Sequence, residues 1–401
     1  MDHQQAAGAG TTSLHTTTLT PFLKYLMAIG CGVVVANIYY CQPLLGALSR
    51  AFSVPESNAS AVNICSQAGY GLGLFFLVPL GDKLERRKLI FWMHLAAALS
   101  LLAGGLASNV LWLDVASIAI GMSSTACQVF IPLAAHLARD EERGKIIGIM
   151  MGGLLTGVLL SRTLSGFVAE YFGWRTVYFV ASVLMVIMAV LMWYALPREK
   201  PSFHGSYLQL MGSLWHLLRE QVVVRQSALI GGALFGAISA FWATLAFFLE
   251  QAPYRYSLSV IGLFGIIGAG GAMISPYIGK IIDRSGPFRP MRIGVLVMTL
   301  GYLILYAGKL HIGIVVAGII LLDMGLQSAH VPNMSRNYAL LPEARTRLNT
   351  LYMTSFFIGG SIGSALGSIA WDYQGWSGVC SVGLVMIVVG AMVVFGGTGR
   401  K

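Results

Sequence analysis

Charged side chains are scarce in this chain. Asp, Glu, Lys and Arg make up 10% of its 401 residues, whereas hydrophobic residues make up 56%. Soluble domains carry about 25% charged residues, so this composition excludes a soluble globular protein. The apolar runs suit helices, which need about 20 residues to cross a bilayer, rather than barrel strands of about 9–11 residues. We therefore expect an all-α membrane protein whose surroundings are the lipid bilayer.

Cysteine is also sparse, and its spacing shows no pattern. The five cysteines, at positions 31, 41, 65, 127 and 380, lie in or beside apolar runs without a Cys-x-x-Cys spacing. This argues against a disulfide framework or a zinc site. The chain lacks a Walker loop, a metal constellation and a serine triad spacing, and Gly69-Tyr-Gly71-Leu-Gly73 lies inside an apolar run rather than after a strand. We predict no cofactor, no metal and no enzymatic activity.

Twelve apolar runs divide the chain. We expect membrane spans at residues 22–48, 58–79, 89–107, 111–137, 146–170, 175–196, 225–250, 258–279, 291–309, 312–340, 348–371 and 376–396. The polar residues 1–21 have no basic region followed by a short apolar core, so we expect a disordered cytoplasmic tail rather than a cleaved signal. The expected organisation is an N-terminal six-helix bundle over 22–196, a cytoplasmic linker over 197–224, a C-terminal six-helix bundle over 225–396 and a tail over 397–401.

The net charge of +10 indicates topology rather than a nucleic-acid partner. Of the 26 Lys and Arg residues, 21 lie in the tails or in loops after even-numbered spans, 4 lie in loops after odd-numbered spans, and Arg162 lies inside a span. Cytoplasmic loops of membrane proteins carry the excess of Lys and Arg. Both termini and the midpoint linker are therefore predicted to be cytoplasmic.

The chain repeats itself at half its length. Asp82 follows one apolar run and precedes a group of cations, and Asp283 does the same 201 positions later. A gapless alignment at a shift of 202 places Gly157 opposite Gly359. Each repeat has an even number of spans, so both repeats enter the membrane from the same side. Parallel repeats of this kind are a transporter architecture.

Both acidic loops resemble the signature loop between the second and third spans of the major facilitator superfamily, Gly-x-x-x-Asp-Arg/Lys-x-Gly-Arg-Arg/Lys. The matching residues are Asp82, Lys83, Arg86 and Arg87 in the first loop, and Gly279, Asp283, Arg284 and Gly286 in the second. In the first loop Val78 and Glu85 stand where the family prefers glycines. The resemblance implies twelve transmembrane helices in two parallel six-helix repeats, which is the major facilitator fold.

Segments 37–43, 162–166, 173–175 and 342–349 are similar to a bacterial branch close to the drug:proton antiporters and nucleoside exporters. The antiporter signature of the fifth span is broken here, because Val158, Ser161 and Arg162 occupy its later positions. The resemblance implies a multi-pass protein of the bacterial inner membrane that works as a monomer. It also implies a central cavity lined by the first, fourth, seventh and tenth spans.

Arg162 and Asp323 stand out because each places a charge inside a span. A cation there costs on the order of 3 kcal/mol, so Arg162 needs a counter-charge or an anionic ligand. It contacts a substrate carboxylate or phosphate, or acts as a gate residue, or is a structural Arg bonded to backbone carbonyls. Asp323 either carries a coupling proton or forms a static pair with Arg162. The pair is the first place to look for chemistry.

Polar residues elsewhere in the cavity-lining spans are candidate substrate contacts. Gln327 and His330 recur with Asp323 on one face of the tenth span, and His330 is either titratable or a satisfied structural His. Pro43 weakens the first span, as a bend that lines the cavity or as an early helix end. The remaining candidates are Asn37, Tyr40, Gln42, Gln128 and Trp242.

The acidic loops are candidate gates. A carboxylate can cap a helix N-terminus and pair with Arg, and such bonds can lock the cytoplasmic side in one state. The alternative is an ordinary loop charge pair of little energy. The predicted gating residues are Asp82, Lys83, Arg86, Asp283 and Arg284.

We therefore expect a secondary active transporter that moves a small organic solute by alternating access. The expected partners are that solute and protons, and the expected direction is export of a drug or metabolite. The alternative is an importer or facilitator of a small organic anion held by Arg162. A membrane enzyme is disfavoured by short basic loops, and a receptor or scaffold by the internal duplication.

Overall fold

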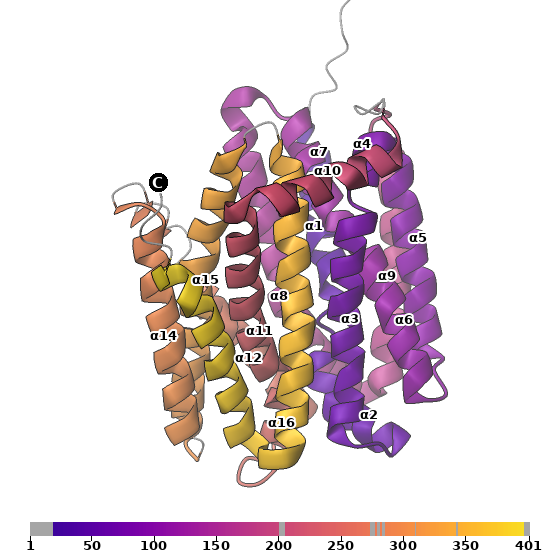
Figure 1. The fold of residues 1–401 in the computed structure, drawn as a ribbon. Coiled ribbons are helices and arrows are strands. Elements are labelled where there is room, and N and C mark those ends of the chain that lie inside the picture. The colour runs from indigo at the N-terminus through magenta and orange to yellow at the C-terminus, as the bar shows by residue number, and fades with distance from the viewer. Residues whose placement is uncertain are drawn as a thin grey trace, which may run out of the picture.

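A computed structural model describes residues 19–199, 205–272, 277–278, 281–282, 285–308, 310–341 and 344–396 of the chain. All regular structure in these ranges is helical, as Figure 1 shows. The long helices run along one common direction, and the short helix over Tyr207–Glu220 lies across one end of the bundle. This is the all-α arrangement expected from the composition.

The N-terminal half begins at residue 19 and ends at residue 199. Its α-helices are α1 (Pro21–Ala36), α2 (Leu45–Phe52), α3 (Glu56–Phe76), α4 (Leu80–Lys83), α5 (Arg86–Gly105), α6 (Val110–Ser123), α7 (Cys127–Leu137), α8 (Arg143–Phe172) and α9 (Trp174–Ala195). Three short 3-10 turns join them, η1 (Gln42–Leu44), η2 (Ser124–Ala126) and η3 (Asp140–Glu142).

The C-terminal half begins at residue 205. Its α-helices are α10 (Tyr207–Glu220), α11 (Val222–Glu250), α12 (Leu258–Ala272), α14 (Phe288–Ala307), α15 (Ile312–Leu340) and α16 (Arg345–Gly396). Gly375 interrupts α16 with a non-helical backbone (φ 57°, ψ −142°), so α16 is two helices joined at a sharp bend. A positive φ of this kind favours glycine.

The described helices account for the predicted spans. Nine of them are long and apolar enough to cross a membrane, and the last of the nine is the α16 pair. Two shorter apolar helices, Pro21–Ala36 and Leu258–Gly268, occupy the first and eighth expected spans. The arrangement is the major facilitator fold of two parallel six-helix repeats, and it is consistent with twelve spans.

Close glycine contacts reproduce the repeat in three dimensions. A Cβ added at Gly157 on α8 would lie 2.1 Å from the carbonyl oxygen of Gly32 on α1. A Cβ added at Gly359 on α16 would lie 2.2 Å from the carbonyl oxygen of Gly232 on α11. Gly157 and Gly359 are equivalent in the sequence repeat, and Gly32 and Gly232 are 200 positions apart. Both halves therefore use the same glycine-to-glycine helix packing, in which small residues let backbones approach closely.

The first and fourth spans are broken, whereas the seventh and tenth are continuous. The helix of the first span ends at Ala36 and resumes at η1, whose second residue is Pro43. The fourth span changes from α6 to α7 through η2. The two breaks meet, because Asn37 Nδ2 donates a hydrogen bond to Ser124 Oγ at 3.1 Å. The predicted weakness near Pro43 is thus a real interruption, and it begins six residues earlier.

The connection between the halves contains the amphipathic helix α10, which lies across the bundle in Figure 1. Its N-terminus is fixed by a capping box between Ser206 and Gln209. Leu214 and Leu217 of α10 pack in one buried cluster with Leu348 of α16. We call the end of the molecule that carries α10 the linker side, and the opposite end, which carries α2, the far side.

Candidate functional site

Arg162 lies about two-thirds of the way along α8 toward the far side, and it contacts residues of η1, α11 and the turn after α1. Its Nε donates a hydrogen bond to Gln42 Oε1 at 2.6 Å. Its guanidinium carbon lies 4.1 Å from the ring centre of Trp242 on α11 and 4.9 Å from that of Tyr39. The side chain is 7% exposed. The buried cation is thus held by one amide oxygen and two aromatic faces, each of which attracts a cation electrostatically.

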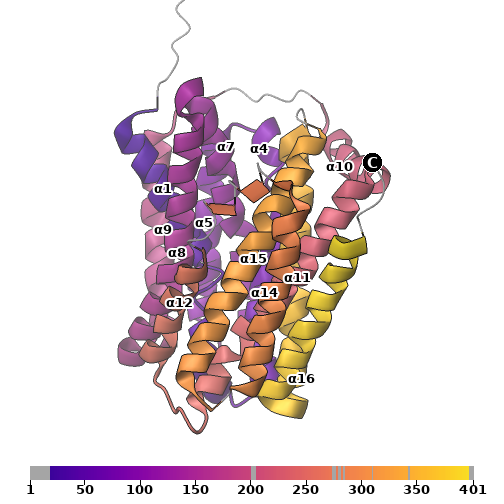
Figure 2. The same cartoon turned by 90° about the vertical axis from the view of Figure 1, so that its left-hand side faces the viewer.

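Helix α12 can approach Arg162 because it presents glycines there. A Cβ at Gly262 would lie 2.6 Å from the carbonyl oxygen of Arg162, and a Cβ at Gly265 would lie 2.9 Å from Cβ of Arg162. Thr163 Oγ1 donates to the Gly262 carbonyl at 3.0 Å. Figure 2 shows α12 beside α8. The two halves therefore meet backbone to backbone at the level of Arg162.

Asp323 on α15 brings a second charge to the same region from the C-terminal half. Its Oδ2 is buried and has no hydrogen-bond partner, although the side chain as a whole is only partly buried. A Cβ at Gly268 would lie 2.8 Å from Asp323 Oδ2 and 3.2 Å from Trp242 Cζ2. Trp242 is therefore near both charges. An unpartnered buried carboxylate oxygen is costly and is a place for a proton or a donor group.

Arg162 and Asp323 do not form a direct ion pair. Among the described residues, no nitrogen of Arg162 lies within 4.0 Å of an Asp323 oxygen. The static pair considered as an alternative from the sequence is not the arrangement in this structure.

The other predicted contacts fall in two groups. His330 Nδ1 lies 2.8 Å from the Tyr352 hydroxyl and its ring packs on Phe356, so it belongs to a cluster with α16 rather than to Arg162. Gln327 is partly buried on the same helix. This polar face of α15 is therefore split, with Asp323 near Trp242 and His330 against α16.

The remaining candidates from the first and fourth spans bond within the N-terminal half. Asn37 also donates to Met185 Sδ at 3.3 Å, and Gln128 Nε2 donates to the Tyr70 hydroxyl at 3.4 Å. Tyr40 is partly buried. Of the predicted substrate contacts, Gln42 and Trp242 both contact Arg162.

Sequence reasoning missed Tyr39 and the polar residues of α3. It selected Tyr40, whereas the ring that faces Arg162 is Tyr39. The interruption after Ala36 changes which side chains face inward, and helical periodicity could not indicate that change. Asn63 and Gln67 are fully buried polar residues of α3, and polar side chains in an apolar run were the available signal.

The first acidic loop forms charge pairs that include the start of the connection between the halves. Arg86 Nη2 lies 3.5 Å from Asp82 Oδ1, and Arg86 Nη1 lies 3.7 Å from Glu199 Oε2. Arg86 Nε also donates to the Gly81 carbonyl at 3.1 Å. Lys83 ends α4 beside them. The predicted gating residues Asp283 and Arg284 lie outside the described residues.

Helix α10 adds a further link on the linker side. The Tyr207 hydroxyl donates to the Phe76 carbonyl at the end of α3, at 2.9 Å. Partial burial raises the pKa of the Tyr207 phenol above its ordinary value of 10.0, which keeps it a neutral donor. The connection is thus attached to the N-terminal half as well as to α16.

Polar contacts between the helices of the two halves gather toward the far side. In the described part of the chain they include Arg50 with Glu250, Glu56 with Trp371, Asn63 and Gln67 with Ser364, Ser361 with the Ile64 carbonyl, Thr163 with the Gly262 carbonyl, and Glu170 with the Ser259 amide. By contrast, a Cβ added at Gly144, Gly148 or Gly152, on the linker-side part of α8, would meet nothing within 4 Å. Among the described residues, the polar contacts between membrane-spanning helices of the two halves thus concentrate toward the far side, whereas Tyr207 of α10 links the halves on the linker side.

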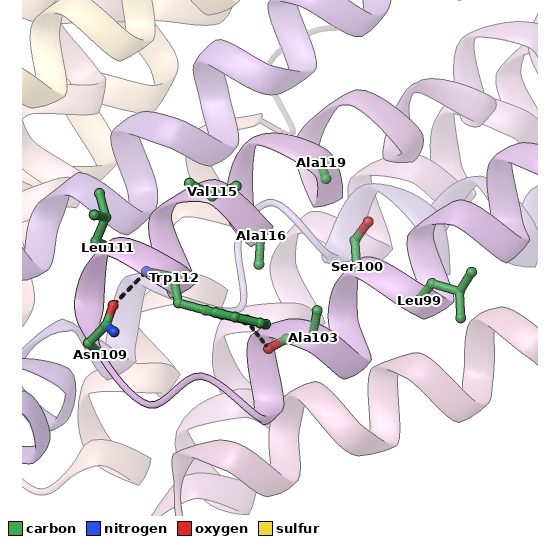
Figure 3. A pocket seen from close by; sticks show the side chains of 9 residues that line it. All are labelled: Leu99, Ser100, Ala103, Asn109, Leu111, Trp112, Val115, Ala116 and Ala119. Carbon is green, nitrogen blue, oxygen red and sulfur yellow. Dashed lines mark hydrogen bonds between the residues drawn. The ribbon is translucent and has the colours of Figure 1, made fainter.

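A pocket lies elsewhere, on α5 and α6. It has a volume of about 600 Å³ and is lined by residues of α5 and α6 and the turn between them, including Leu99, Leu111 and Trp112, which Figure 3 shows. Trp112 Nε1 donates to the Ala103 carbonyl at 3.0 Å across its floor. These three side chains are large, apolar and exposed. This surface is a groove on the outside of the helix bundle, apart from the Arg162 region.

Fold and site together define a multi-pass helical membrane protein with charges from both halves in its interior. The profile described as Major Facilitator Superfamily matches residues 27–337. The relative named "Putative uncharacterized transporter YgaY" of Escherichia coli strain K12 is 40% identical over 96% of this chain and 97% of its own length. The chain therefore belongs to the Major Facilitator Superfamily and is a membrane transporter of small solutes.

Other similarities agree with this membership. The inner membrane transport protein YnfM of Escherichia coli strain K12 is 25% identical over 93% of this chain and 90% of its own length. A bacterial homolog of the human lysosomal transporter Spinster, solved in an inward-facing and occupied conformation, has a TM-score of 0.71 at 13% identity, covering 93% of this chain and 96% of that one. The nucleoside transporter NupG has a TM-score of 0.69 at 14% identity, covering 93% and 98%. At these identities the two structures support the fold alone.

Proposed function

We propose that this transporter exports a small organic solute, a drug or a metabolite, from a bacterial cell in exchange for protons. The observation that carries the proposal is the arrangement around Trp242. Arg162 of the N-terminal half and Asp323 of the C-terminal half both lie beside its ring without pairing with each other. Two opposite charges left apart at the contact between the halves are available to a proton and a solute.

The two charges differ in the partners that they have. Arg162 is compensated by Gln42 and by the rings of Tyr39 and Trp242. Asp323 Oδ2 has no donor, so protonation or a solute donor satisfies it best. A proton on Asp323 neutralises the carboxylate, so the carboxylate no longer attracts a cationic or donor group of the solute. Proton binding and solute binding at Asp323 therefore exclude each other. That exclusion is the requirement for antiport.

The distribution of contacts supports one state of an alternating cycle. Among the described residues, the polar contacts between membrane-spanning helices of the two halves lie toward the far side, and the linker-side part of α8 is largely exposed. With both termini in the cytoplasm, as the basic loops predict, this is a state closed to the outside. The bundles over 22–196 and 225–396 then rock about the site, with the 197–224 linker cytoplasmic. In the other state, which is closed to the cytoplasm, the gate consists of Asp82, Lys83, Arg86, Asp283 and Arg284.

Import of a small organic anion is the second candidate. The observation that favours it is the permanent positive charge of Arg162, since a guanidinium does not lose its proton in proteins. An anion bound there leaves Asp323 to take up a proton, which gives symport rather than antiport. The direction of the proton effect separates the two candidates.

The experiment uses purified protein in proteoliposomes and a solute found by a thermal-shift screen of a broad library at two pH values. Asp323→Asn is expected to abolish transport driven by a pH gradient while solute exchange between the two sides continues. The matched control is Asp114→Asn, because Asp114 Oδ1 on α6 is also buried without a hydrogen-bond partner. Unchanged pH-driven transport in Asp323→Asn refutes the coupling role.

A further inference from the structure

A chain of hydrogen bonds starts at Arg162 and crosses from one half to the other. Arg162 Nε donates to Gln42 Oε1 at 2.6 Å, and Gln42 Nε2 donates to Asn63 Oδ1 at 3.3 Å. Asn63 Nδ2 donates to Ser364 Oγ at 3.1 Å. Ser364 Oγ then donates to the Ser239 carbonyl at 3.3 Å. This chain of hydrogen bonds links α8, η1 and α3 of the N-terminal half to α16 and α11 of the C-terminal half.

The direction of donation along this chain of hydrogen bonds is set at Arg162. A guanidinium can only donate hydrogen bonds, so Gln42 must turn its oxygen toward Arg162 and its NH₂ group toward Asn63. Asn63 must then accept with its oxygen and donate with its nitrogen to Ser364. The hydroxyl hydrogen of Ser364 is left for the Ser239 carbonyl. Each orientation follows from the one before it, so the chain behaves as a unit.

Water cannot easily replace any of these bonds. Gln42 is 4% exposed, and Asn63 and Ser364 are fully buried. A buried amide that loses its partner costs far more than a surface amide that turns to solvent. A change at Arg162 therefore has to be met by a change at Gln42, and then at Asn63.

We propose that Gln42, Asn63 and Ser364 are positioning residues that hold the Arg162 guanidinium and transmit its occupancy to the far-side contact. The proposal rests on the proposed alternating access and adds the link between the site and one gate. A solute anion that draws Nε away from Gln42 leaves that amide free to turn. Asn63 Oδ1 then keeps only the weak thiol donor of Cys41, whose Sγ lies 3.8 Å away, and the bond of Asn63 to Ser364 in the opposite half weakens. Occupancy of Arg162 thereby favours opening on the far side.

Helix α16 offers a matched control for this chain. Ser361 lies one turn from Ser364 and donates to the Ile64 carbonyl of α3 at 3.0 Å. Ser361→Ala and Ser364→Ala each remove a hydroxyl from the same contact between the same two helices. Only Ser364 belongs to the chain that begins at Arg162. If the contact between the two helices is purely structural, Ser361→Ala and Ser364→Ala should each combine with a Gln42 substitution in the same way.

The test is a double-mutant cycle that needs no solute. Spin labels at Ser108→Cys and Gln251→Cys, exposed far-side positions in opposite halves, report the closed and open populations by electron–electron double resonance in nanodiscs. The unsubstituted protein controls for labelling of the native cysteines, of which four are buried. Gln42→Leu is combined with Ser364→Ala in one cycle and with Ser361→Ala in the other.

Each single substitution is expected to shift the closed-to-open ratio toward open by about fivefold, the effect of one net hydrogen bond. With Ser364→Ala, the double variant should differ from the product of the single effects by about threefold or more, whereas with Ser361→Ala it should agree within about twofold. Equal behaviour of the two pairs overturns the proposal. If Gln42→Leu does not fold, Gln42→Glu replaces it, because it still accepts from Arg162 but cannot donate to Asn63. Transport results for Asp323→Asn do not enter this cycle, so either proposal can fail alone.

Discussion

Replacing Trp242 tests how the buried charge of Arg162 is held. The ring centre lies 4.1 Å from the guanidinium carbon, and Arg162 is 7% exposed. A cation–π contact contributes about 0.5–1 kcal/mol at exposed sites and about 2 kcal/mol or more when it is desolvated. The burial of Arg162 places this contact at the upper end. Trp242→Leu should therefore lose about 2 kcal/mol from this contact, in addition to the packing lost with the larger ring.

Thermal unfolding in detergent measures the effect. For a unit of about 150–250 residues, 1 kcal/mol corresponds to about 2–4 °C in Tm, so the lost contact alone should lower Tm by about 4–8 °C. Trp242→Phe keeps an aromatic face and should recover most of this. Trp193→Leu is the matched control, because Trp193 is partly buried and its ring centre lies 4.5 Å from the more exposed guanidinium of Arg87. Trp242 does not hold the Arg162 charge if Trp242→Leu lowers Tm no more than Trp193→Leu does, or if Trp242→Phe and Trp242→Leu lower Tm equally.

Two further predictions concern packing and the linker side. Gly157→Ala should lower Tm markedly, because its Cβ would lie 2.1 Å from the Gly32 carbonyl oxygen. Gly148→Ala on the same helix meets nothing within 4 Å and should raise the free energy of unfolding by up to about 1 kcal/mol. Equal Tm values for the two variants would contradict the packing described. Glu199→Gln should cost no more than about 1 kcal/mol, since its pair with Arg86 at 3.7 Å is partly solvated. Arg86→Ala should cost more, because it also loses the Gly81 carbonyl and Asp82, and an equal loss of Tm in both variants would count against that arrangement.

The fold followed from the sequence because the bilayer imposes strict rules. Hydrocarbon requires each span to satisfy its own backbone hydrogen bonds, so apolar run length predicted the helices well. The repeat was visible as Gly157 opposite Gly359, and the structure shows why both are glycine, since each packs on another helix backbone. These are local requirements that a single sequence displays.

The site followed only in part. Arg162, Gln42 and Trp242 were predicted and lie in contact, because a buried cation and polar groups in apolar runs are conspicuous. Tyr39 was missed because the helix interruption after Ala36 rotates the following residues in a way that no periodicity records. The partners of His330 and Asn63 lie 22 and 301 residues away. Contacts between distant elements depend on how the two halves meet.

Arg162 and Asp323 are proposed to form one site in which solute binding depends on both charges, and a binding cycle measures this dependence. The dissociation constant of a solute from the thermal-shift screen is measured by calorimetry for the wild type, Arg162→Lys, Asp323→Asn and the double variant. If both charges act at one site, the double variant should depart from the sum of the single effects by about 1 kcal/mol or more. Single effects that add to within about 0.5 kcal/mol would show two independent sites and would contradict the account.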